Sequence, residues 1–134
     1  MKLNQFMHTH LILRGDREQL AEITKTEMVA HLLAAKAKIR TPATWTQGTE
    51  ARDAKGEPVL ASNASAVSFC SLGAMFASEP DRLANYVAAV FRTAARVAKS
   101  EAAFAIGTYN DQHTHSEVMQ LWDDVISVVD ALEE

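Results

Sequence analysis

The sequence predicts an α-rich α+β fold: a compact bundle of about four helices, a small β-hairpin and an N-terminal segment that fits either a strand or a helix. Three long stretches repeat apolar residues at intervals of three and four, which is typical of amphipathic helices. Another stretch is rich in β-branched residues and turn formers instead. The chain has 134 residues, of which 48% are hydrophobic and 22% charged. That size and composition predict a single globular domain over residues 1–134.

The first fourteen residues allow two interpretations. Phe6, His8 and His10 recur at the period of a strand, but the same residues also fit a helix, and Gly15 marks a break in either case. From Asp16 the spacing becomes helical, and Thr24 and Thr26 are candidate internal starts. Pro42 ends this helix, whose apolar positions are Leu20, Ile23, Met28, Val29, Leu32, Leu33 and Ile39.

The segment between Thr44 and Leu60 predicts a small β-hairpin. Aromatic and β-branched residues precede an Asp-Ala-Lys-Gly turn, and Pro58 and Val59 follow it. Aspartate and glycine are common turn residues, so we expect a hairpin from Trp45 to Val59 with its tip at residues 53–56.

Residues 62–79 predict one short helix at the centre of the fold. Ser62 and Asn63 are candidate N-caps, and Pro80 disfavours helical geometry at Glu79. A stripe of small residues would let another backbone approach closely, and a bulkier stripe lies beside it. The small residues are Ala66, Cys70, Gly73 or Ala74, and Ala77, and the bulky ones are Phe69, Leu72 and Phe76.

The C-terminal third predicts two further helices. Asp81 to Lys99 has one buried face, and Thr114 with Glu117 forms a capping box that begins a final helix rich in valine. Residues 101–108 fit either a continuation of the preceding helix or a buried strand, and Gly107 favours a break. Residues 109–115 are predicted to be a loop.

Charge and composition exclude several classes of function. A net charge of −4 argues against nonspecific binding to nucleic-acid phosphates, which requires clustered cations. No apolar run approaches the roughly 18 residues of a membrane span. A single cysteine cannot form an intramolecular disulfide. We therefore expect a cytoplasmic protein that binds neither nucleic acid nor membrane.

Four short motifs follow one another along the chain: Trp45, Thr46, Gln47 and Gly48; Ala51, Arg52, Asp53 and Gly56; Phe69, Cys70, Leu72, Gly73 and Ala74; and Asn110, Asp111, Thr114, Glu117 and Val118. In this order they resemble a family of uncharacterised small proteins from phages and actinobacteria, a domain of unknown function. The resemblance covers roughly residues 28–130, leaves residues 1–24 as an N-terminal extension, and does not include His113 or His115. It implies a related fold and no activity, and it suggests the host cytoplasm as the location of a phage-encoded chain.

Cys70 is a candidate nucleophile. A reactive thiolate needs a lowered pKa, commonly from a neighbouring histidine, and His31, His113 and His115 are the candidate bases. With Asn110 or Asp111 as orienting group, such a set would support a cysteine-dependent hydrolase or transferase. The competing interpretation, which we favour, is that Cys70 packs as a small hydrophobic residue.

Two pairs of histidines could bind a metal ion. His8 with His10 and His113 with His115 each project on one side of an extended segment, and imidazole is a common ligand of zinc. Four imidazoles would meet only if the two segments lie together. Otherwise these are solvated residues, which is the interpretation we favour.

A polar and aromatic set predicts a binding site. Asn110 and Asp111 are typical of turns, where they bond their own backbone. They could instead line a pocket with residues of the hairpin. We predict a non-enzymatic binding or interaction module without a cofactor, acting on a host protein or small ligand and able to form a homodimer. Its candidate ligand-binding residues are Trp45, Gln47, Arg52, Asn110 and Asp111.

Overall fold

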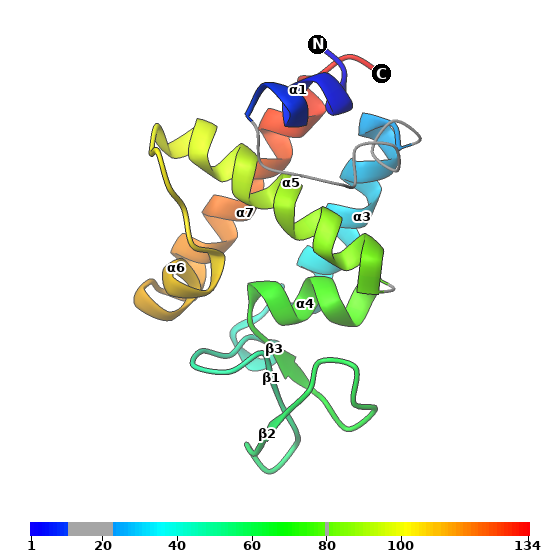
Figure 1. Ribbon diagram of the computed structural model, residues 1–134. Helices are drawn as coiled ribbons and strands as arrows, with labels where there is room; N and C mark the ends of the chain where they lie inside the picture. The colour runs from blue at the N-terminus through cyan, green and yellow to red at the C-terminus, as the bar shows by residue number, and fades with distance from the viewer. Residues whose placement is uncertain (11–22, 80) are drawn as a thin grey trace.

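A computed structural model describes residues 1–10, 23–79 and 81–134, and confirms the α-rich α+β fold. Figure 1 shows a body of helices with the strands gathered at one end, beyond α4. The helices are α1 (Leu3–Thr9), α3 (Lys25–Lys38), α4 (Ser71–Ser78), α5 (Asp81–Lys99), α6 (Ile106–Gln112) and α7 (His115–Asp130), and a 3-10 turn spans Pro42–Thr44. The strands are β1 (Ala51–Arg52), β2 (Pro58–Val59) and β3 (Ser68–Phe69).

The N-terminal segment is a helix, so the strand interpretation was wrong there. Leu3, Phe6 and Met7 are buried at helical spacing and dock α1 on the core. Residues 11–14 of that segment, and residues 16–22 of the next predicted helix, lie outside the described residues.

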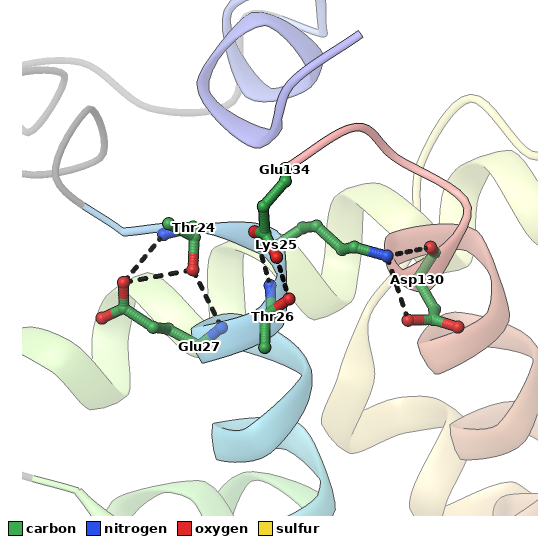
Figure 2. Close-up of polar contacts among 6 residues, drawn as sticks. All are labelled: Thr24, Lys25, Thr26, Glu27, Asp130 and Glu134. Carbon is green, nitrogen blue, oxygen red and sulfur yellow. Dashed lines mark hydrogen bonds and ion pairs between the residues drawn. The ribbon is translucent and has the colours of Figure 1, made fainter.

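The helix α3 begins where a capping box places it. Thr24 is the N-cap: its hydroxyl accepts from Glu27 N at 3.1 Å, while Glu27 Oε1 accepts from Thr24 N at 3.3 Å. Figure 2 shows that the last residues of the chain also reach this end of α3. Thr26 N donates to Glu134 Oε2 at 3.2 Å, and Lys25 Nζ donates to the Asp130 carbonyl at 2.7 Å. The hydroxyl and amide of Thr26 lower the pKa of Glu134.

The predicted hairpin forms, and a third strand joins it. The strands β1 and β2 are antiparallel, and the intervening turn ends at Gly56 with φ +81°. The third strand, β3, pairs with the other edge of β1, giving the order β2-β1-β3. Because Ser68 and Phe69 belong to this strand, the single helix predicted over residues 62–79 was wrong. Only residues 71–78 of it are helical, and Cys70 is the N-cap.

The shortened helix α4 is nevertheless central. It packs against α3, α5 and α6, and its first turn receives the backbone of the hairpin. Cys70 N donates to the Glu50 carbonyl at 3.0 Å, and a Cβ at Gly73 would collide with that same carbonyl. The predicted close approach of a second backbone is therefore confirmed at Gly73.

The helices α5 and α7 form as predicted, whereas α6 was not predicted. Phe91 of α5 meets Trp122 of α7 edge to face, with ring centroids 4.7 Å apart, in the middle of the core. Residues 109–112, predicted to be loop, belong to α6, and Gly107 lies inside this helix rather than breaking it. None of the helices in the described parts of the chain is long and apolar enough to cross a membrane.

Candidate functional site

Asn110 lies at the centre of a buried hydrogen-bond network that joins three segments. Its side chain is fully buried. The Oδ1 atom accepts from Trp45 Nε1 at 2.9 Å and from the amide and hydroxyl of Ser71 at 3.0 Å each. The Nδ2 atom donates to the Thr46 carbonyl at 2.9 Å. One amide thus binds the start of the hairpin and the start of α4 to α6.

Two further side chains fasten the Trp-Thr-Gln-Gly segment to α6. Gln47 Nε2 donates to the carbonyls of Asn110 and His113, at 3.0 and 2.9 Å. Asp111 Oδ1 accepts from Gly48 N at 2.9 Å, and Gly48 has φ +83°, a conformation that favours glycine. These bonds hold the C-terminal end of α6 in place.

Arg52 braces the hairpin from within. Its guanidinium donates to Thr46 Oγ1 at 2.8 Å, to the Gln47 carbonyl at 3.0 Å and to the Gly56 carbonyl at 3.1 Å. The five predicted ligand-binding residues therefore lie within one connected hydrogen-bonded region, as the sequence suggested. Their polar groups bond to protein atoms, so the arrangement positions neighbouring elements. We define Trp45, Gln47, Arg52, Asn110, Asp111 and Ser71 as the Asn110 network.

An open pocket of about 260 Å³ lies beside the network, between α6 and residues 101–105. Aromatic rings form one side: Tyr109 stacks on His113 with centroids 3.6 Å apart and 9° between planes, and Phe104 lies 5.4 Å from Tyr109. The His113 ring is fixed because Nδ1 lies 2.8 Å from the Tyr109 carbonyl. Polar groups complete the lining, which is Glu101, Ala103, Phe104, Ala105, Thr108, Tyr109, Gln112 and His113.

The sequence did not predict this pocket because its residues 109–112 were expected to be a loop rather than part of α6. Tyr109 and His113 are four residues apart, a spacing that brings side chains together only on a helix. The helix has no side-chain cap at Ala105, so no local start signal was present. Ser71 was likewise missed because it was placed inside a longer helix.

Cys70 lies at the beginning of α4, not two turns into it. The side chain is 7% exposed, and its sulfur accepts a hydrogen bond from Gly73 N at 3.3 Å. Burial raises the pKa of this thiol, and hydrogen bonds from the backbone of Gly73 and Leu72 only partly offset that effect. A raised pKa is the opposite of what an activated nucleophile requires.

The candidate bases are engaged elsewhere. His31 Nδ1 lies 2.6 Å from Glu79 Oε1, and His115 Nε2 lies 2.7 Å from the Ile39 carbonyl. His113 stacks in the pocket described above. The structure describes every histidine of the chain, and none of these histidines hydrogen-bonds to Cys70.

The two histidine pairs lie at opposite ends of α7. His8 lies on α1 and His10 is its C-cap. The start of α1 pairs with Glu133 just beyond α7, whereas His113 and His115 lie where α7 begins. A helix of 16 residues is about 24 Å long. In the described ranges, no group of three or more His, Cys, Asp or Glu side chains could hold a metal ion.

A second pocket of about 310 Å³ lies between the hairpin region and the helices α4 and α5. Its lining combines Leu60, which is 68% exposed, with Phe76 and the polar residues Glu50, Ser62 and Asn85. Glu50 is held there because its Oε1 accepts from Ala61 N at 2.7 Å.

Comparison with known proteins places this geometry in a family. Residues 24–128, which are well over half of the chain, match the profile of a family of unknown function, DUF6197. The chain belongs to the DUF6197 family. The match confirms the predicted resemblance to an uncharacterised domain. A search of curated proteins and a search of solved structures found no match.

The part of the chain matched to DUF6197 contains both the Asn110 network and the aromatic pocket. It begins at Thr24, the N-cap of α3, and reaches Val128 in the last turn of α7. The helix α1 lies before the matched region.

Proposed function

We propose that this DUF6197 chain is a non-enzymatic binding module whose ligand is a small planar molecule held in the pocket beside α6. The observation that carries the proposal is the aromatic series Phe104, Tyr109 and His113 along one side of an open pocket. Ligand sites commonly combine aromatic walls with a few polar groups that fix orientation.

The size of the pocket limits the ligand. A volume of about 260 Å³ equals that of roughly nine water molecules at ~30 Å³ each. That space suits one or two fused rings rather than a drug-sized molecule. Glu101 offers a carboxylate, while Thr108 and Gln112 offer a hydroxyl and an amide, so a ring that carries hydrogen-bond donors is the best match.

The Asn110 network supports this role by fixing the wall of the pocket before a ligand arrives. Gln47 holds the carbonyls of Asn110 and His113, which bracket the last turn of α6. A wall fixed in advance lowers the entropy lost on binding. The predicted ligand-binding residues Trp45, Gln47, Arg52, Asn110 and Asp111 thus act as positioning residues.

The cysteine-dependent alternative has less support. Cys70 is buried, its thiol pKa is raised by burial, and its hydrogen bond goes to Gly73. Hydrolase or transferase chemistry at this position would require a change of conformation that exposes the sulfur.

A screen of small planar compounds by ¹H–¹⁵N correlation NMR tests the proposal. Binding should perturb the amides of Thr108, Tyr109, Gln112 and His113, and His113→Ala should weaken it at least tenfold. The matched control is His8→Ala, an exposed histidine on α1, which should leave the affinity unchanged. A screen with no binder, or binders that perturb other amides only, would count against the proposal.

A protein partner is the second candidate, favoured by the exposure of Leu60 beside Phe76. An apolar side chain that is 68% exposed at the edge of a pocket can anchor a partner surface. If the chain is encoded by a phage, as its motifs suggest, that partner would be a host protein. Leu60→Asp should abolish capture of such a protein, whereas Val67→Asp, on another part of the sheet region, should not.

A further inference from the structure

The pocket between the hairpin region and the helices α4 and α5 has the composition of a second ligand site. Its lining combines two apolar side chains, Leu60 and Phe76, with three polar ones, Glu50, Ser62 and Asn85. Sites for small ligands commonly have apolar walls and a few polar groups that fix the orientation of the ligand. The lining shares no residue with the pocket beside α6, so a ligand here is separate from the planar one proposed above.

Glu50 is held in a fixed position at this pocket. Its carbonyl accepts from Cys70 N at 3.0 Å and lies so close to Gly73 that no Cβ would fit there. Its side chain is fixed as well, because Oε1 accepts from Ala61 N at 2.7 Å. That bond commits one carboxylate oxygen to the protein and leaves Oε2 for a ligand. A carboxylate that is oriented in advance loses little conformational entropy when a cation binds.

The single available oxygen favours an ammonium group over a guanidinium. A guanidinium binds a carboxylate best through two parallel hydrogen bonds, which require both oxygens. An ammonium group is a compact charge with three donors, and the lining offers three acceptors. These acceptors are Glu50 Oε2, the hydroxyl of Ser62 and the amide oxygen of Asn85.

The apolar side chains of the lining match the rest of such a ligand. Phe76 on α4 is half-buried, and Leu60 is largely exposed, so both have apolar surface that a ligand can cover. Methylene chains that end in an ammonium group lie along apolar surface while the charged end stays in polar surroundings. The volume of about 310 Å³ equals that of roughly ten water molecules at ~30 Å³ each, which is room for a short chain, its ammonium group and some water.

We infer that this pocket binds a primary alkylammonium group, with Glu50 as its counter-ion and with Leu60 and Phe76 against its methylene chain. The group belongs either to a free aliphatic amine or to a lysine side chain of a protein partner. The second source rests on the partner proposed above for Leu60. The isolated group should bind weakly, in the millimolar range, because an ion pair in an open pocket is partly solvated.

A ¹H–¹⁵N correlation NMR titration with n-butylamine tests the inference. Amines of this kind have a pKa of about 10.4 and are charged at pH 7. Binding should perturb the amides of Ala61, Ser62, Phe76 and Asn85. n-Butanol, which has the same chain without the charge, should bind about tenfold more weakly, and n-butylguanidine should bind no more tightly than the amine. Equal binding of n-butanol, tighter binding of the guanidine, or shifts confined to other amides would overturn the assignment.

Glu50→Gln isolates the charge, because a glutamine oxygen can still accept from Ala61 N. It should weaken the binding of n-butylamine about tenfold. The matched control is Glu57→Gln, an exposed carboxylate beside the hairpin turn, which should leave the affinity unchanged. If Glu50→Gln does not fold, Asn85→Ala, an exposed position on α5, provides the same test and should weaken binding severalfold. Unchanged affinity in either folded variant would overturn the inference.

A blocked peptide with one lysine, acetyl-Gly-Lys-Gly-amide, distinguishes the two sources. Tighter binding than n-butylamine indicates a lysine of a protein partner, and weaker binding indicates a free amine; both results keep the ammonium site. Planar compounds that perturb the amides of Thr108 and His113 should bind Glu50→Gln as they bind the unmodified chain. The pocket beside α6 and the ammonium site can therefore fail independently.

Discussion

Replacing Asn110 with alanine should destabilise the protein more than any conservative change at its surface. The substitution leaves Trp45 Nε1, Ser71 N and the Thr46 carbonyl without their partner, which now lies 2.9–3.0 Å from each. A buried polar group without a partner costs about 1–3 kcal/mol. Allowing for some water entry, we expect the free energy of unfolding to fall by about 3–5 kcal/mol, a large part of the ~5–15 kcal/mol typical of a domain.

Urea unfolding followed by far-UV circular dichroism measures this loss. Gln112→Ala is the matched control: it lies on the same helix but is exposed, so its effect should stay within about 0.5 kcal/mol. Trp45→Phe removes the indole donor and replaces the bicyclic ring with a smaller one, and it should cost about 1–2 kcal/mol. If Asn110→Ala costs less than about 1 kcal/mol, the hydrogen bonds at this position do not hold the fold together.

Three further predictions concern α4, α6 and the start of α7. Gly73→Ala should prevent stable folding because its Cβ would collide with the backbone of Glu50. Gly107→Ala has ordinary space around its Cβ and should stabilise the folded protein by about 0.5–1 kcal/mol. Thermal unfolding distinguishes the two variants, and equal effects would refute the close approach of the backbone at Gly73. Cys70 should react with iodoacetamide far more slowly at pH 7 in the native state than in urea, because burial raises its pKa; rapid native labelling would restore the catalytic interpretation. Hydrogen bonds from the backbone and side chain of Thr114 lower the pKa of Glu117 below its ordinary 4.5. The stability that these hydrogen bonds contribute is therefore present above pH 4.5 and is lost as the pH falls through the lowered pKa. Thr114→Ala should flatten this loss of stability in acid, and an unchanged pH profile of stability would contradict the capping role.

Local signals in the sequence marked the start of α7 and the tip of the hairpin. The capping box at Thr114 begins α7, the Asp53 turn forms the tip of the hairpin, and Thr24, one of two candidate internal starts, is the N-cap of α3. These features depend on residues three or four apart, so a single sequence can report them.

The sequence failed where distant contacts decide the structure. Ser68 and Phe69 look helical beside their neighbours, but pairing with β1 makes them a strand, and this moves Cys70 to a helix N-cap. The helix α6 has no capping side chain and contains a glycine, so packing against α4 and α7 determines it. The joining of Trp45 to Asn110 was predicted as a convergence, but the bonds that make it a brace became visible only in the structure.

Hydrogen exchange of the Trp45 indole Nε1–H, followed by NMR, tests the central claim most directly. That proton is donated to Asn110 Oδ1 at 2.9 Å, although the ring itself is only partly buried. If the Asn110 network is a fixed brace, the indole proton and the amide of Ser71 should exchange together, at the slow rate set by unfolding of the core. An indole proton that exchanges at the rate of a solvent-exposed tryptophan would show that the hairpin is not fastened to α6.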